Sequence, residues 1–144
     1  MSLVEVLNDP QKKPVVVADC CRLVDDEVAS KGGFSGMAVK AGYAAVKGIK
    51  PGFIAEVVEK LLPEWAQKLD PLWAEGKQGG RPTEYVLQHR GRVADALLSV
   101  TDEKSKQAKS SLVRGTYDRL RGSAKKNVEE AMPRLAQLLA KHAG

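Results

Sequence analysis

Apolar residues recur at every third or fourth position along most of the chain, which is the spacing of one face of an α-helix. Glycine, proline and short polar runs separate the apolar segments, and such residues commonly end helices. No segment shows the strict alternation of a half-buried strand. The pattern therefore predicts an all-α fold with helices over residues 2–7, 14–31, 35–49, 53–69, 83–87, 92–101, 111–121 and 123–143.

Three blocks in the first half of the chain match three blocks in the second half, in the same order. The matched blocks are 17–19 with 93–95, 39–43 with 113–117, and 58–69 with 128–139. In the longest block Pro63 and Pro133 take the same place, and each should bend or begin a helix, because proline removes a backbone donor and crowds the preceding turn. Helices rich in alanine and lysine also resemble one another generically, but ordered matches with gaps only at predicted breaks favour a true internal repeat.

A repeated unit of this length contains three helices and would bury its apolar face against its twin. We therefore expect a single helical domain over residues 1–144. Its predicted architecture is a compact helical bundle built from two repeated three-helix units with a pseudo-two-fold arrangement. The units extend over about 15–76 and 91–143, with a glycine-rich linker at about 76–82.

Composition favours a soluble globular protein, because 43% of the residues are hydrophobic and 28% are charged. No apolar run approaches the roughly 20 residues that cross a bilayer. The N-terminal stretch 1–5 lacks a basic region followed by an apolar one, so no signal peptide is expected. Cys20 and Cys21 are adjacent, and neighbours in a helix do not easily form a bridge, which favours free thiols and a cytoplasmic location.

The sequence does not indicate an enzyme. It contains no glycine-rich phosphate loop after a strand and no Cys/His or Ser/His arrangement at a recognisable spacing. The two histidines, His89 and His142, lie far from the cysteines along the chain, and the acidic run 25–27 lacks the spacing of a calcium loop. We therefore expect no catalytic residue, metal site or cofactor, and interpret the acidic run as a solvated helix face.

A motif of two cations around a tyrosine occurs once in each half. Its spacing places the three side chains close to one face of a helix. The members are Lys40, Tyr43, Lys47, Arg114, Tyr117 and Arg121. Two cations beside an aromatic ring suit a phosphate or carboxylate. In the alternative, which we favour, each tyrosine fills the core and the cations extend around its rim.

Charge is distributed unevenly between the halves. Residues 1–75 hold 9 Lys and Arg against 11 Asp and Glu, whereas residues 76–144 hold 14 against 7. The basic excess includes Lys125 and Lys126, which we add to the anion-binding candidates. Such a cluster suits nucleic acid, anionic lipid or an acidic protein. No DNA-reading motif and no interleaved aromatic residues accompany it, so nucleic acid is the less favoured partner.

The two tryptophans, Trp65 and Trp73, lie eight residues apart on either side of Pro71. The simpler interpretation is that both fill the core. The alternative is a ligand pocket near them, because helical bundles form such pockets between facing helices.

At residues 3–10, 17–19, 36–43 and 93–102 the chain resembles a family of small bacterial proteins with no assigned function. The resemblance implies a bacterial, cytoplasmic, helical protein and supplies no catalytic or binding residue. Our interpretation is a non-enzymatic binding or scaffolding protein, with an unknown protein or a second copy of the chain as partner. The alternatives are a sequence-independent nucleic-acid or anion binder that uses the basic second half, and a small-ligand carrier with a pocket near the tryptophans.

Overall fold

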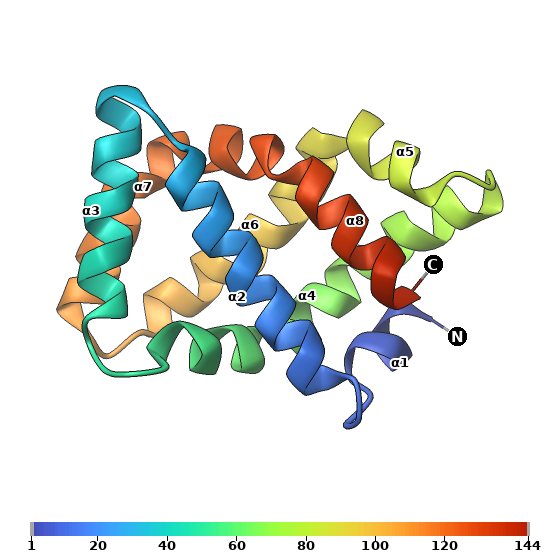
Figure 1. The fold of residues 1–144 in the computed structure, drawn as a ribbon, viewed down its shortest axis with the longest axis horizontal. Helices are drawn as coiled ribbons and strands as arrows, with labels where there is room; N and C mark the ends of the chain where they lie inside the picture. Colours follow the sequence, from blue (N-terminus) through green and yellow to red (C-terminus); the bar gives the residue numbers. More distant parts are fainter. Residues whose placement is uncertain (1, 144) are drawn as a thin grey trace.

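The computed structural model describes residues 2–143, except for the side chains of Phe34 and Ser35, and these residues form a compact all-α fold (Figure 1). The predicted fold class is confirmed. The helices are α1 (Leu3–Leu7), α2 (Lys13–Ser30), α3 (Gly33–Lys47), α4 (Phe53–Gln78), α5 (Pro82–Gln88), α6 (Arg90–Gln107), α7 (Ser111–Glu130) and α8 (Met132–Ala143).

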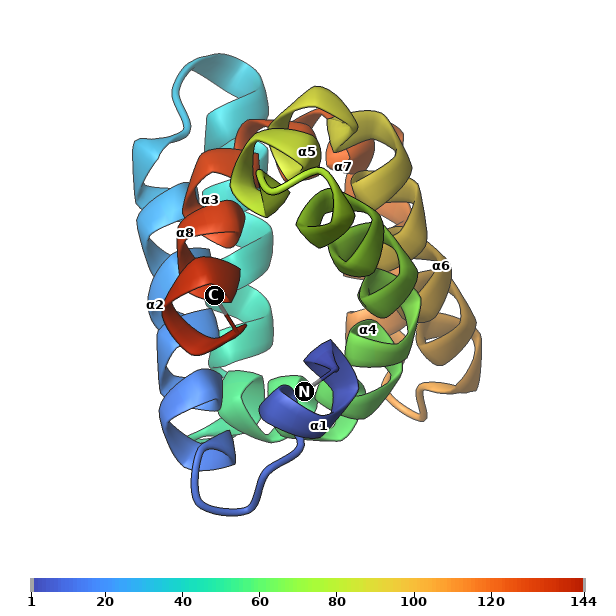
Figure 2. The same ribbon diagram turned by 90° about the vertical axis from the view of Figure 1, so that its right-hand side faces the viewer.

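The long helix α4 is the central element, and it contacts α1, α2, α3, α5 and α6. Figure 2 shows α2, α3 and α8 on one side of the molecule and α4 and α6 on the other, with α7 reaching α3 at the back. The core is formed where α1, α4, α5 and α8 meet the first turns of α2 and α6. Its most deeply buried side chains are Leu3, Leu7, Val16, Trp73, Val86, Val93, Met132 and Leu139.

The short helix α1 begins as the sequence predicts. The Ser2 hydroxyl accepts a hydrogen bond from the backbone N–H of Glu5 at 3.2 Å, which caps the first turn. The backbone N–H of Leu3 donates to a carboxylate oxygen of Asp70 at 2.9 Å, which ties α1 to α4. A helix of five residues is not stable alone, so these contacts and its buried leucines hold it in place.

The prolines act differently in the two halves. Pro133 is the second residue of α8, so the prediction that it begins a helix is confirmed. Pro63 and Pro71 lie inside α4, which continues through both and follows an arc around the centre of the molecule (Figure 2). A curved helix accommodates a missing donor because the carbonyl that faces the proline ring tilts outward.

Three predicted boundaries lie elsewhere. Helix α6 continues to Gln107, beyond the predicted end at residue 101. Helix α4 continues to Gln78, so the connection to α5 is residues 79–81 rather than 76–82. Helix α7 runs through Gly122, where the sequence suggested an end, and stops at Glu130. The backbone of Gly122 does not adopt the left-handed conformation that would terminate a helix, whereas Gly80, just after α4, does so with φ of 75°.

Gly76 allows α4 and α5 to approach closely. A Cβ atom on Gly76 would lie 2.8 Å from the Cα atom of Pro82 and 2.9 Å from the Cβ atom of Tyr85. Both are rigid atoms close to the backbone, so they cannot move aside as the end of a long side chain would. Gly115 in α7 is also helical, and nothing lies within 4 Å of the position of its Cβ atom.

We predict opposite effects for alanine at these two glycines. Gly76→Ala should lower the free energy of unfolding by about 1–3 kcal/mol because α5 must shift away from α4. Gly115→Ala should raise it by up to about 1 kcal/mol through helix propensity alone. Urea denaturation followed by circular dichroism measures both, and a Gly76→Ala variant as stable as the parent would contradict the close packing of α4 and α5.

Candidate functional site

In the second half, the cation and tyrosine motif binds a carboxylate of the protein itself. The Tyr117 hydroxyl donates to Asp102 at 2.5 Å, and Arg121 donates two parallel bonds to the same carboxylate at 2.8 and 3.1 Å. These bonds join α6 to α7. The Arg121 guanidinium, followed by the Tyr117 hydroxyl, holds the pKa of Asp102 below its usual range. Burial and the neighbouring carboxylate raise the pKa of Tyr117 to about 12.

The first half contains a similar cluster between α2 and α3. The Tyr43 hydroxyl donates to Asp25, and the Lys47 ammonium lies 3.4 Å from the same carboxylate. The Tyr43 hydrogen bond is the main cause that lowers the pKa of Asp25. In each half, therefore, an aspartate of the preceding helix already occupies the place that the anion hypothesis gave to a ligand. Both tyrosines are only half-buried and lie outside the core, which corrects the favoured prediction that each tyrosine fills the core. The motif instead joins neighbouring helices.

The other predicted anion-binding residues are scattered. Arg114 donates to the carbonyl oxygen of Ala108, and the Lys125 ammonium lies 3.1 Å from Asp95. Lys40 and Lys126 are exposed, and neither forms an ion pair within residues 2–143. Lys126 differs from the rest because it lines a polar cleft.

The two tryptophans have different environments. Trp73 is 2% exposed and belongs to the core, and its indole nitrogen has no hydrogen-bond partner among the described residues. Trp65 is half-buried, and its indole N–H donates to the carbonyl oxygen of Leu97 at 3.2 Å. One face of Trp65 borders an apolar cavity. The structure therefore places one of the two predicted pocket residues at a cavity and the other in the core.

This cavity has a volume of about 290 Å³ and lies between α2, α3, α4, α6, α7 and α8. Most of its wall is aliphatic, and several wall positions are valine, alanine or cysteine, whose short side chains do not reach across it. The lining residues are Cys20, Leu23, Val24, Glu27, Val28, Lys31, Val39, Val58, Trp65, Leu97, Leu98, Thr101, Asn127, Val128, Ala131, Met132 and Leu135.

The size of the cavity is suited to a small molecule. Apolar cavities of roughly 150 Å³ stay dry and take up benzene, so this one has about twice the volume that such a ring needs.

Charged residues adjoin the cavity around Glu27, and their carbon atoms rather than their charged groups face it. The Glu27 side chain is only 9% exposed, so the prediction of a solvated face is wrong for Glu27, whereas Asp25 and Asp26 are exposed as predicted. Arg134 donates to Glu27 at 2.6 Å, and Lys31 lies 3.4 Å from it and 2.7 Å from Glu130. Burial of a carboxylate requires such partners. The i, i+4 spacing of Glu27 and Lys31 was visible in the sequence, but Arg134 lies 107 positions away from Glu27 along the chain.

The same charged residues line a polar cleft of about 420 Å³ on the other side of Glu27. The cleft lies between the end of α2, the start of α3 and the junction of α7 with α8. It is lined by Glu27, Ser30, Lys31, Gly32, Gly36, Ser123, Lys126, Asn127, Glu130 and Arg134. Glu27, Lys31 and Asn127 also line the apolar cavity, so the two hollows are adjacent.

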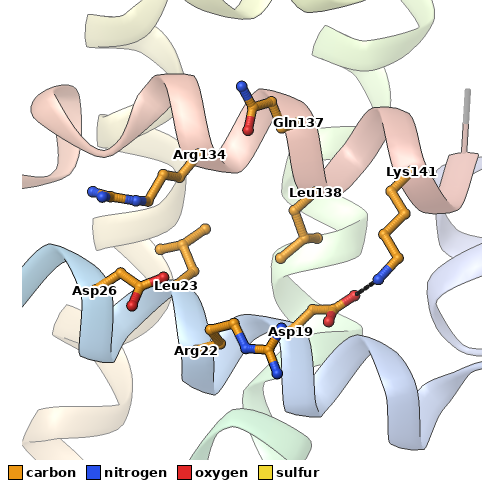
Figure 3. A pocket seen from close by; sticks show the side chains of 8 residues that line it. All are labelled: Asp19, Arg22, Leu23, Asp26, Arg134, Gln137, Leu138 and Lys141. Carbon is orange, nitrogen blue, oxygen red and sulfur yellow. Dashed lines mark hydrogen bonds and ion pairs between the residues drawn. The ribbon is translucent and has the colours of Figure 1, made fainter.

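A third hollow, of about 250 Å³, lies between α2 and α8 (Figure 3). Asp19 joins its two sides: the Lys141 ammonium is 2.9 Å from this carboxylate, and a ring nitrogen of His142 is 2.7 Å from it. The Lys141 hydrogen bond is the main cause that lowers the pKa of Asp19. These contacts join α2 to α8, and we assign the residues around this third hollow a structural role.

The cysteines are free thiols on adjacent positions of α2. Cys20 lines the apolar cavity, and burial raises its pKa to about 12. Burial also raises the pKa of Cys21, which does not line the cavity. Within residues 2–143, no three His, Cys, Asp or Glu side chains lie in a group suited to a metal ion. The described helices are also too short or too polar to span a bilayer.

Fold and site together define an all-α protein with an apolar cavity between its helices and a charged cleft beside it. The chain belongs to a family of unknown function, DUF6918, whose profile matches residues 3–143. The family agrees with the resemblance noted from the sequence. No curated protein and no solved structure matches this chain.

The Asp102 cluster predicts a specific dependence of stability on pH. The pKa of Asp102 is lower in the folded protein than the 3.8 of an unperturbed aspartate, so its contribution is complete above about pH 4 and is lost as the pH falls through the folded value. Asp102→Asn should lower the free energy of unfolding by about 1 kcal/mol at pH 7, because this partly exposed pair is screened by solvent. The difference from the parent protein should shrink below pH 4.

Asp118→Asn is the matched control, because Asp118 is exposed on α7 and forms no ion pair within the described chain. It should change the free energy of unfolding by less than about 0.5 kcal/mol at any pH. Denaturant titrations between pH 3 and 7 test this prediction, and a difference between Asp102→Asn and the parent that did not vary with pH would contradict it.

Proposed function

We propose that this protein is a non-enzymatic binding protein that holds a small apolar molecule in the cavity beside Trp65. One observation carries the proposal, namely the cavity of about 290 Å³ with an aliphatic wall. Ligand sites in helical bundles lie between facing helices, are mostly apolar and have a few polar groups at one side. Glu27, Lys31, Thr101 and Asn127 are the polar residues in this wall.

The alternative of nucleic-acid binding has less support. Several cations of the basic second half form ion pairs with acidic residues of the same chain. Lys104 lies 3.3 Å from Glu64, and Lys125 lies 3.1 Å from Asp95. A cation that is already paired with a carboxylate attracts a phosphate more weakly, because the two opposite charges partly cancel. We therefore place the ligand in the cavity rather than on the basic surface.

The internal repeat and the bacterial cytoplasmic location belong to this proposal as well. The repeat is supported by the two clusters in which a tyrosine and a cation bind one aspartate, Asp25 in the first half and Asp102 in the second. The halves differ in where their second and third helices are separated. This break lies at residues 48–52 in the first half and at Ala131 in the second. The family resemblance and the free cysteines support the proposed location.

The test is binding of 1-decanol, a neutral and mostly apolar probe, followed by Trp65 fluorescence. Trp73→Phe should be made first, so that Trp65 is the only tryptophan. Phenylalanine keeps an aromatic ring in the core, and the indole N–H that it removes has no partner among the described residues. Decanol should shift the Trp65 emission in a saturable manner.

Val24→Phe should weaken decanol binding at least about tenfold, because the larger side chain occupies the space of the ligand. Val15→Phe is the matched control, since it makes the same change on the same helix at a side chain that is 50% exposed and outside the cavity wall. It should alter the affinity less than about twofold. Equal affinities in the two variants, or no saturable signal in the parent, would refute the proposal.

A chemical readout is independent of fluorescence. In a Cys21→Ala variant, only Cys20 remains, and bound decanol should slow its reaction with a thiol reagent at least about threefold, because the ligand covers the thiol. In a Cys20→Ala variant, decanol should leave the reaction of Cys21 unchanged. Protection of both cysteines alike would place the probe elsewhere.

A further inference from the structure

We propose that the natural ligand is an amphiphile whose apolar chain lies in the cavity beside Trp65 and whose anionic head group lies in the adjacent polar cleft. This inference rests on the proposed function and assigns the chemical class of the ligand. The main observation is that Glu27, Lys31 and Asn127 line both hollows. A molecule that extends from one hollow to the other must pass these three side chains.

The sign of the head group follows from the charges around the cleft. Three cations, Lys31, Lys126 and Arg134, face two carboxylates, Glu27 and Glu130. Glu27 forms ion pairs with Arg134 at 2.6 Å and with Lys31 at 3.4 Å. Glu130 forms an ion pair with Lys31 at 2.7 Å. Lys126 is left without an ion-pair partner within residues 2–143, so a carboxylate or phosphate would complete the balance. A cationic head would instead add a fourth positive charge.

The position of α3 agrees with this preference. Gly32, the N-cap of α3, lines the cleft, and the N-terminal end of a helix carries partial positive charge. The side-chain amide of Asn127, in the wall shared by the two hollows, is a further donor group.

The volumes limit the length of the apolar chain. A cavity twice the size of one that takes up benzene holds about a dozen heavy atoms. The polar cleft of about 420 Å³ has room for a carboxylate with its hydration or for a phosphate. Decanoate is therefore a suitable probe, and 1-decanol and decylamine match its chain with a neutral and a cationic head.

The experiment measures the affinity of all three probes through Trp65 emission in the Trp73→Phe protein. Decanoate should bind at least about fivefold more tightly than decanol, and decylamine should bind more weakly than decanol. Lys126→Glu should reduce the affinity for decanoate about tenfold and leave that for decanol within about twofold. Raising the salt concentration should weaken the binding of decanoate but not that of decanol.

Lys125→Glu is the matched control. It makes the same charge change at the neighbouring residue, which is paired with Asp95 and lies outside both hollows. It should leave all three affinities within about twofold, so that a general effect of net charge is separated from a contact in the cleft.

The outcomes separate this inference from the proposed function. Saturable binding of decanol without any preference for decanoate would overturn the anionic head group while the apolar carrier stands. Equal losses from Lys126→Glu and Lys125→Glu would also overturn it. If none of the three probes binds, both proposals fail. Replacing decanoate with decyl phosphate in the same assay distinguishes a carboxylate ligand from a phosphate ligand.

Discussion

The packing of other helices around α4 is the constraint on which the structure depends. Helix α4 spans Phe53–Gln78, and α1, α2, α3, α5 and α6 all contact it. At its C-terminal end Gly76 brings α5 close, and at its centre the buried residues Leu62, Ala66 and Leu69 belong to the core. Beside Trp65, where six helices meet, several wall positions carry short side chains, and these leave the cavity.

The sequence predicts the helices well because each depends on local spacing. The Ser2 cap, the extent of α2 and the face that Tyr43 shares with Lys47 all follow from residues within two turns of one another. The ends of α4 and α7 are less predictable. Pro71 weakens a helix locally, but burial of Leu69, Leu72 and Trp73 outweighs that cost, and α7 continues through Gly122 because glycine is tolerated inside a helix. Propensity is a weak term compared with packing.

The cavity itself could not be predicted from the sequence. Its wall combines residues from six helices, and whether a valine such as Val24 meets a neighbour or an empty space depends on the packing of all of them. The same limit applies to Glu27, whose partner Arg134 comes from the last helix. It also explains why Trp65 and Trp73, which have similar surroundings in the sequence, lie at a cavity and in the core.

The two aspartate clusters also differ in strength, and this has a consequence for the motion of the molecule. Arg121 donates two parallel hydrogen bonds to Asp102, whereas the single, exposed ammonium group of Lys47 lies 3.4 Å from Asp25. A guanidinium fork orients a carboxylate more firmly than a point charge does. Helix α3 is therefore held less firmly to α2 than α7 is to α6, and it buries few side chains. Local opening should begin at α3 rather than at α7, and because Val39 of α3 forms part of the cavity wall, this opening would expose one side of the cavity.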